Sequence, residues 1–288
     1  MKLLSIVFSF KNEEKNLQEL IERTAKSLSD LTNWKYEMIF VNDFSTDKSE
    51  EILLNLQSQY PITIINMSRN FGVGPCVLAG FKYSKGDAII YIDSDLRDPP
   101  EIIKELVKEH EKGAEVVHTV RTKRLGESKV KMFLTVVAYK IINYFSDIPL
   151  HVNAGDFKLI SRKALDKILE LKEFRPYIRG LSVWVGYKQS KVYYVREPRS
   201  SGKSNFSIFG SGPVNEFLTG ITAYSLKPLY LSIILGFFAM FVSLILILHT
   251  IYAKLNNLTA LGSAGILISI SFFSGIILLS QGIMAIYI

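Results

Sequence analysis

Two aspartates separated by one residue, Asp93 and Asp95, follow the short apolar run 88–92. Such a run with polar flanks is typical of a buried β-strand, so both carboxylates would stand where that strand ends. Carboxylate oxygens are the ligands that Mg²⁺ and Mn²⁺ prefer, and these ions bridge to substrate phosphates. The pair therefore predicts a site for Mg²⁺ or Mn²⁺ that serves a phosphate-bearing substrate. Asp98, followed by two prolines, instead fits the N-cap of a helix.

Another carboxylate, Asp156, follows Asn153, Ala154 and Gly155 and precedes an apolar run. Asparagine and glycine favour tight turns, so we expect Asp156 on a turn that aims its carboxylate into a cleft. A side chain that only stabilises the turn is the alternative. Because a phosphate monoester is largely dianionic at neutral pH, Asp156 would orient a phosphate acceptor or a sugar as much as remove a proton.

A loop of small and basic residues occupies 199–205 and carries Arg199, Lys203 and Ser204. Arginine and lysine bind phosphate oxygens, and glycine lets a loop move, so this segment is suited to close over phosphates. A solvated basic linker is the alternative. The 4 histidines lack the spacing of zinc ligands. The single Cys76 excludes an intrachain disulfide and fits a small buried apolar residue.

The segment 1–120 must position these residues, and in it short apolar runs alternate with longer amphipathic ones. This alternation predicts an α/β fold, a mostly parallel sheet with helices on both faces. Ligands of such sheets bind beyond the carboxyl ends of the strands, so the polar residues that close the first four runs should gather at one edge. They are Ser9, Lys11, Asn12, Glu13, Asn42, Asp43, Ser68, Arg69, Asn70, Asp93, Ser94 and Asp95.

The pattern continues beyond residue 100. We expect a helix to about Lys112, a strand at 115–120, a helix at about 128–145, a helix capped by Ser161, a helix at 175–187 and a strand at 191–197. In the helix at 175–187, Arg179 and Trp184 fit a surface arginine and a core aromatic without a special role.

Two long uncharged stretches end the sequence, and Lys254 is the only Asp, Glu, Lys or Arg after Lys227. Since about 20 apolar residues cross a hydrocarbon core, we expect two membrane-spanning helices within 228–288. The net charge of +7 lies almost wholly before them, and the positive-inside tendency then places residues 1–204 in the cytoplasm. The N-terminal apolar run passes directly into charged residues, so it fits a strand better than a signal peptide.

The intervening segment 205–227 mixes Phe, Ile and Leu with Gly, Asn and Ser, which predicts interfacial amphipathic helices. The basic balance suits membrane lipid or phosphorylated substrates as partners. Lysines and arginines alternate with acids and form no long run, so the sequence argues against nucleic acid.

The sequence as a whole resembles the family 2 glycosyltransferases that act on polyprenyl phosphates, which include dolichyl-phosphate mannose synthases and bacterial undecaprenyl-phosphate glycosyltransferases. The resemblance rests on the ordered motifs FSFKNEEKN, FVNDFSTD, SRNFG, AGFKYSKGDAIIYIDSDLRDPPE, NAGDFKLISR, IRGLSVWVG and RSSGKSNFS, followed by two spans. It implies a GT-A (Rossmann-like) catalytic domain at 1–204. It also implies a metal-dependent, inverting transfer of a sugar from a nucleotide-sugar donor to a polyprenyl phosphate at the cytoplasmic membrane face.

The resemblance also implies roles for individual residues. Asp156 matches the proposed catalytic carboxylate, and Asp93 and Asp95 match the residues that hold metal and diphosphate. Further contacts to the nucleotide sugar would come from Ser9, Lys11, Glu13, Asp43 and Ser94. Binding of phosphate or acceptor would fall to Arg121, Arg199, Lys203 and Ser204.

The sequence departs from the family pattern within the site. The family usually has Pro and Tyr where Ser9 and Lys11 stand, Asp and Gly where Asn42 and Phe44 stand, and Gln where Arg97 stands. Arginine cannot coordinate a cation, so Arg97 would instead contact the diphosphate and replace part of the metal charge.

These departures leave a second interpretation open, a catalytically weakened membrane scaffold that binds nucleotide sugar. A processive polysaccharide synthase is a third, which the small number of spans and the lack of a Gln-x-x-Arg-Trp segment disfavour. The sugar, the choice of UDP or GDP, the carrier length and the formation of a homo-oligomer stay open. Relatives usually continue with a charged segment, so we expect either a truncation or an unusually short terminus at Ile288.

Overall fold

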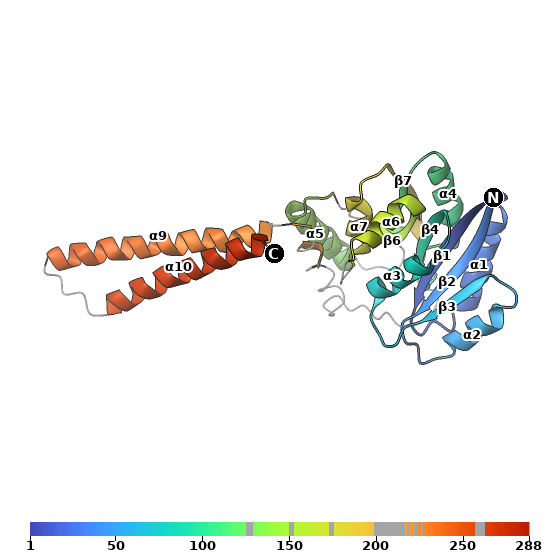
Figure 1. The fold of residues 1–288 in the computed structure, drawn as a ribbon, viewed down its shortest axis with the longest axis horizontal. Coiled ribbons are helices and arrows are strands. Elements are labelled where there is room, and N and C mark those ends of the chain that lie inside the picture. The colour runs from blue at the N-terminus through green and yellow to red at the C-terminus, as the bar shows by residue number, and fades with distance from the viewer. Residues whose placement is uncertain are drawn as a thin grey trace. The chain divides into compact units, whose positions relative to one another are not determined.

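The computed structural model describes residues 1–124, 129–149, 153–172, 176–198, 217, 219–221, 224–225, 227–256 and 263–287. The chain forms two compact units, Met1–Tyr144 with Ile148–Gly220, and Phe145–Asp147 with Ile221–Ile288. The first unit is built on one seven-stranded sheet, and the second carries two long helices (Figure 1).

The sheet has the strand order β3-β2-β1-β4-β6-β5-β7. Its strands are β1 (Lys2–Phe10), β2 (Trp34–Asn42), β3 (Ile62–Asn66), β4 (Ala88–Asp93), β5 (Val116–Arg124), β6 (Ala154–Ser161) and β7 (Gln189–Arg196). The pairs β1–β2, β2–β3, β1–β4 and β5–β7 are parallel, whereas β6 runs antiparallel to β4 and β5. The predicted mostly parallel sheet is confirmed, with β6 as its reversed strand.

Helices pack on both faces of this sheet (Figure 1). They are α1 (Leu17–Ser29), α2 (Ser49–Leu56), α3 (Val73–Tyr83), the 3₁₀ helix η1 (Pro100–Ile102), α4 (Ile103–Glu111), α6 (Arg162–Glu170) and α7 (Ile178–Trp184). A further helix, α5 (Lys129–Phe145), follows β5 and contacts α7 through a hydrogen bond between Tyr139 and Arg179. Ser161 caps α6 as predicted, since its side chain accepts a hydrogen bond from the amide of Ala164.

Alternation along the strands separates two apolar layers. In β1, Leu4, Ile6 and Phe8 belong to the layer that contains α1 and α4, whereas Val7 belongs to the layer that contains α3, α6 and α7. The thiol-bearing Cys76 of α3 is buried in the second layer, as expected.

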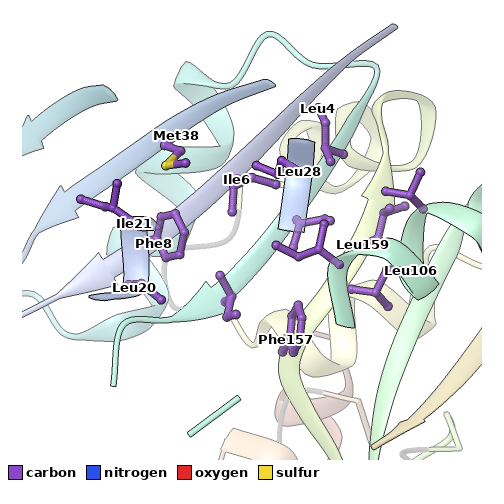
Figure 2. Close-up of a cluster of buried hydrophobic side chains, with 14 of the residues drawn as sticks. Leu4, Ile6, Phe8, Leu20, Ile21, Leu28, Met38, Leu106, Phe157 and Leu159 are labelled. Atoms are coloured by element: carbon purple, nitrogen blue, oxygen red, sulfur yellow. The ribbon is translucent and has the colours of Figure 1, made fainter. Parts of the chain in front are cut away.

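Strand β6 contributes Phe157 and Leu159 to the layer beneath α1 and α4 (Figure 2). Both side chains are fully buried near Phe8 of β1 and Leu106 of α4, and Phe8 stacks on Phe40 with ring centroids 4.5 Å apart. Full burial of each such side chain stabilises the fold by about 1.5–3 kcal/mol. A one-residue slip of β6 would turn both out of this layer, so the layer fixes which side chains of β6 face the other way.

The second unit contains α9 (Lys227–Leu255) and α10 (Ser263–Tyr287). Within them, Leu229–Ala253 and Ile268–Ala285 are long and apolar enough to cross a membrane. The helices approach closely at Gly236 and Gly275, where a Cβ on either would lie 3.0 Å from the other's carbonyl oxygen. The two predicted long apolar helices are confirmed, and most of the predicted interfacial segment 205–227 lies outside the described residues.

Helix α3 packs closely against β1 and β2 at Gly80. A Cβ on Gly80 would lie 2.3 Å from Cγ1 of Val7 and 3.2 Å from Cγ2 of Val41. Gly80→Ala should therefore lower the free energy of unfolding by about 1–3 kcal/mol through overpacking. Val7→Ala removes the clashing methyl, so the double variant should lose less than the sum of the two single losses. Denaturant unfolding followed by circular dichroism measures this, and additive losses would contradict it.

Candidate active site

The carboxyl ends of β1, β2, β3 and β4 lie side by side at one edge of the sheet, as predicted. The parallel register sets Ser9 beside Asp93 and aligns Phe10, Asn42 and Asn66 in one row. The side-chain amide of Asn42 donates a hydrogen bond to Oδ1 of Asn66 at 3.0 Å. These contacts make the polar strand ends one continuous edge.

Asp43 follows β2 and anchors the segment before α3. Its Oδ1 accepts a hydrogen bond from the amide of Phe71 at 2.7 Å, and its Oδ2 accepts one from the amide of Gly72 at 3.0 Å. Gly72 has a φ of 85°, a conformation that glycine adopts without strain. The carboxylate predicted to bind the nucleoside therefore also fixes the loop beside that position.

Lys11 and Glu13 lie on the loop after β1. Lys11 is exposed, and the carboxylate of Glu13 accepts a hydrogen bond from Nδ2 of Asn16. The amide of Thr46 donates to Oδ1 of Asn12 at 2.8 Å, which ties this loop to the one after β2. The predicted phosphate-binding residues Arg199, Lys203 and Ser204 lie outside the described residues.

Asp93 ends β4 beside a chain of hydroxyl groups. Tyr91 Oη donates to Oδ1 of Asp93 at 2.7 Å and lies 2.9 Å from Ser9 Oγ, and Ser94 Oγ donates to the Ser9 carbonyl at 2.9 Å. Burial raises the pKa of Asp93 to about 6, and neighbouring carboxylates add to the shift. They are Asp95, Asp98 and Asp156. This edge therefore concentrates negative charge that a bound cation would relieve.

Asp95 pairs with Arg97 two positions later. Nε and Nη2 of Arg97 both lie 2.5 Å from Oδ2 of Asp95, and the Arg97 amide donates to Oδ1 at 3.2 Å. The arginine that departs from the family pattern thus contacts one of the two predicted metal ligands. It places a positive charge at that carboxylate.

Asp98 does not cap the following helix, so the N-cap interpretation is wrong. The helix η1 begins after Pro99 without a side-chain cap. Asp98 is fully buried and accepts hydrogen bonds from Arg121 Nη2 at 3.1 Å, from Arg196 Nε at 3.0 Å and from the hydroxyl of Tyr194. Burial alone would raise the pKa of Asp98, but the two guanidinium groups hold it below its ordinary value. Arg121, predicted to bind phosphate, thus serves this buried ion pair.

Asp156 lies within β6 and not on a turn, so that part of the expectation is wrong. The antiparallel register sets Lys158 of β6 opposite Tyr91 of β4. Asp93 and Asp156 each lie two residues beyond this pair, and the charge of Asp156 contributes to the raised pKa of Asp93. Tyr91 and Ile160 lie in the layer with α3, α6 and α7, and strand alternation directs Asp93 and Asp156 toward the same face. The structure thus brings the two carboxylates together at the end of β4.

Arg179 of α7 binds Asp156 with two nitrogens. Nε donates to Oδ1 at 2.9 Å and Nη2 to Oδ2 at 2.5 Å, while Nη1 donates to the Tyr139 hydroxyl at 2.8 Å. Burial alone would raise the pKa of Asp156, but Arg179, with Lys158 and Arg121, lowers it to about 2. Asp156 is therefore an ionised carboxylate with a defined orientation, suited to hold a hydroxyl or a cationic centre of a reactant.

Lys158 lies two residues after Asp156 and is buried on the same face of β6. Its Nζ donates to Ser182 Oγ at 3.0 Å. Burial lowers the pKa of Lys158 to about 8, although Asp156 opposes the shift. Sequence analysis missed Lys158 and Arg179, and a lysine inside an apolar strand was the one signal available. Trp184, interpreted as a core aromatic, is 53% exposed.

Within the described residues, no group of three or more His, Cys, Asp and Glu side chains forms a metal site by itself. A cation at Asp93 and Asp95 would therefore need further ligands, as an ion that bridges to substrate phosphates does.

Comparison with known proteins shows which proteins this chain resembles. The family model described as Glycosyl transferase family 2 matches residues 5–169. A Bacillus subtilis protein named uncharacterized glycosyltransferase YkcC is 38% identical over 286 residues, which cover 99% of this chain and 88% of that protein. An Escherichia coli protein named prophage bactoprenol glucosyl transferase homolog is 32% identical over 290 residues, which cover 99% and 93%. A solved structure of glucosyl-3-phosphoglycerate synthase from Mycobacterium tuberculosis matches with a TM-score of 0.48 and 18% identity, covering 77% of this chain and 78% of that one.

The buried position of Asp98 predicts a large loss of stability on its neutralisation. Asp98→Asn should lower the free energy of unfolding by about 3–5 kcal/mol at neutral pH, because Arg121 and Arg196 would keep buried charges without a counter-charge. Asp166→Asn removes a 55% exposed partner of Arg162. As the control, it should change stability by less than about 0.5 kcal/mol.

The same pair of variants tests the pH dependence. Because the folded pKa of Asp98 is depressed, its stabilising contribution is present above its ordinary pKa of about 3.9 and is lost as the pH falls through the folded value. The difference between wild type and Asp98→Asn should therefore shrink in acid. Denaturant unfolding at neutral and acidic pH measures it, and a constant difference would contradict this assignment.

Proposed function

The chain belongs to glycosyl transferase family 2, and from this premise we propose that it transfers a sugar from a nucleotide-sugar donor to a polyprenyl phosphate with inversion at the anomeric carbon. The observation that carries the proposal is that the ionised Asp156 of β6 lies near enough to Asp93, at the end of β4, to influence its pKa. The two helices able to cross a membrane support a lipid-linked acceptor. So does the similarity to proteins named bactoprenol glucosyl transferases.

We assign the donor to the polar edge of the sheet. Its nucleoside would lie beside the loops that follow β1 and β2, and its diphosphate beside the residues that follow β4. The nucleoside contacts would come from Ser9, Lys11, Glu13 and Asp43, and the diphosphate contacts from Asp93, Ser94, Asp95 and Arg97. This assignment places the donor at the carboxyl ends of parallel strands, where the backbone turns leave room for a ligand.

Asp93 and Asp95 fit a divalent cation. Both are oxygen ligands at a strand end. Burial, together with the charges of neighbouring carboxylates, raises the pKa of Asp93, and a bound cation would favour its ionised form. Arg97 already offsets part of the charge on Asp95. Bound Mg²⁺ or Mn²⁺ would neutralise the charge that develops on the leaving nucleoside diphosphate.

The acceptor phosphate supplies the nucleophile. One of its oxygens attacks the anomeric carbon while the bond from that carbon to the diphosphate oxygen breaks, and the diphosphate leaves with the electron pair. Because the acceptor is largely dianionic at neutral pH, it needs no base to remove a proton. A carboxylate with a pKa of about 2 is a weak base at that pH. We therefore assign to Asp156 the orientation of the acceptor or the sugar.

The surroundings of the acceptor complete the proposal. The loop with Arg199, Lys203 and Ser204 would bind the acceptor or donor phosphates. The first unit would lie on the cytoplasmic side, in line with the positive-inside tendency. Anionic lipid would attract the basic residues near the membrane, each contributing about 1 kcal/mol.

The test is a screen of radiolabelled UDP- and GDP-sugars with the full chain in lipid nanodiscs that contain polyprenyl phosphate. We expect one donor to give a lipid-phosphate sugar, which thin-layer chromatography detects. Donor binding without product would support the scaffold interpretation instead.

The role of Asp156 predicts separate effects on turnover and on binding. Asp156→Asn should lower turnover by about 100-fold or more and change the donor Kd by less than about threefold, because the carboxylate acts mainly in the transition state. Initial rates and equilibrium binding of the donor measure the two quantities. Asp166→Asn is the control and should match the wild type in both. Equal losses of binding and turnover would move Asp156 into the donor site.

The pair of Asp95 and Arg97 predicts a competition between arginine and metal. Arg97→Gln should tighten the binding of Mn²⁺ in the presence of nucleoside diphosphate by about tenfold, which equals about 1.4 kcal/mol. The reason is that the variant frees Asp95 from a bound positive charge. Titration followed by electron paramagnetic resonance measures free Mn²⁺. Arg97→Lys keeps the charge and should stay near the wild type, and Mn²⁺ binding that is unchanged or weaker in Arg97→Gln would contradict this account.

A further inference from the structure

Helix α7 meets β6 through matched polar positions. Ile178 and Leu181 lie in the apolar layer with α3 and α6. Arg179 and Ser182, three residues apart, lie on one side of the helix, and they contact Asp156 and Lys158, two residues apart on one face of the strand. The helix is therefore set against β6 by an ion pair and a hydrogen bond that both require this register.

The guanidinium of Arg179 is fixed on two sides. Two of its nitrogens donate to the two oxygens of Asp156, and the third donates to Tyr139 of α5. The planar fork of arginine matches a carboxylate with two parallel bonds, which a lysine ammonium cannot do. Arg179 and Asp156 keep 21% and 22% of their side chains exposed, so the pair lies at the surface of the site.

We propose that Arg179, held by Tyr139, is a positioning residue for the sugar transfer: it fixes the plane of the Asp156 carboxylate toward the reactants. This inference rests on the proposed function. A free carboxylate rotates about its terminal bond, whereas one bound through both oxygens has a single orientation. Geometry of this kind decides rate, since a misplacement of about 1 Å can cost about 100-fold.

The experiment compares variants of the full chain in lipid nanodiscs with polyprenyl phosphate and the donor found by the screen. Arg179→Gln should lower turnover by about 100-fold while the donor Kd stays within about threefold of the wild type. Arg179→Lys keeps the charge without the fork and should recover about tenfold of that loss. Tyr139→Phe keeps Arg179 but removes the hydroxyl that receives Nη1, and it should lower turnover by about threefold to tenfold.

A surface pair of the same geometry provides the matched control. Arg23 donates to Glu101 through Nε at 3.0 Å and Nη2 at 2.9 Å. Arg23→Gln removes a two-bond arginine–carboxylate pair between α1 and η1, and it should leave turnover unchanged. Denaturant unfolding of each variant separates lost positioning from lost folding.

Four outcomes would overturn the proposal. The first is turnover of Arg179→Gln within about threefold of the wild type. The second is a loss of turnover in Arg179→Gln that is accompanied by equal losses of donor binding and stability. The third, if Arg179→Gln does not fold, is wild-type turnover in both Arg179→Lys and Tyr139→Phe. An inactive wild type with every donor would remove the proposed function and this inference with it, whereas an active wild type with an unaffected Arg179→Gln would count against Arg179 alone.

Discussion

The alternation of side chains along β6 is the constraint on which the site depends. Phe157 and Leu159 are buried beneath α1 and α4, which forces Asp156 and Lys158 toward the opposite layer. Strand β6 runs antiparallel between β4 and β5, so Asp156 lies toward the end of β4, near enough to Asp93 to affect its pKa. A parallel strand at this place would carry the third residue of β6 to the other end of the sheet, so its reversed direction is what assembles the carboxylates.

The four aspartates of this region differ in what neutralises them. Asp98 has two guanidinium groups and a hydroxyl, and its burial makes it part of the core. Asp95 forms an ion pair with Arg97, and Asp156 forms one with Arg179. For Asp93 the structure shows a hydrogen bond from Tyr91, and it has the raised pKa. A carboxylate whose charge is balanced by a nearby arginine serves to stabilise the fold or to hold a fixed orientation. A carboxylate whose charge is not balanced in this way is suited to bind a cation or a cationic reactant.

Local patterns were enough for the elements but not for the ion pairs. The apolar run before Asp93 predicted β4, and the pattern after residue 100 predicted a helix to about Lys112, where α4 ends at Glu111, because the spacing of apolar residues indicates which side of an element is buried. The contacts of Asp98 with Arg196 and of Asp156 with Arg179 join elements that are distant in sequence. No local spacing contains them. The prolines after Asp98 predicted a helix cap because a cap is a local pattern. The actual partners of Asp98 are Arg121, Tyr194 and Arg196, which are distant in sequence and leave no local pattern.

The pKa of Asp93 is raised and that of Asp156 is lowered, which suits the two carboxylates to different roles at the end of β4. Burial raises the pKa of a carboxylate, and other carboxylates nearby add to the rise unless a positive charge opposes them. Arg179, with Lys158 and Arg121, lowers the pKa of Asp156 to about 2 despite its burial. Burial, with the charges of Asp95, Asp98 and Asp156, raises the pKa of Asp93 to about 6. Asp156 is thereby a permanent anion that can orient a reactant, and Asp93 gains most from a metal ion. Arg179 is the largest of the effects that lower the pKa of Asp156, so a residue to which the sequence assigned no role keeps this carboxylate ionised.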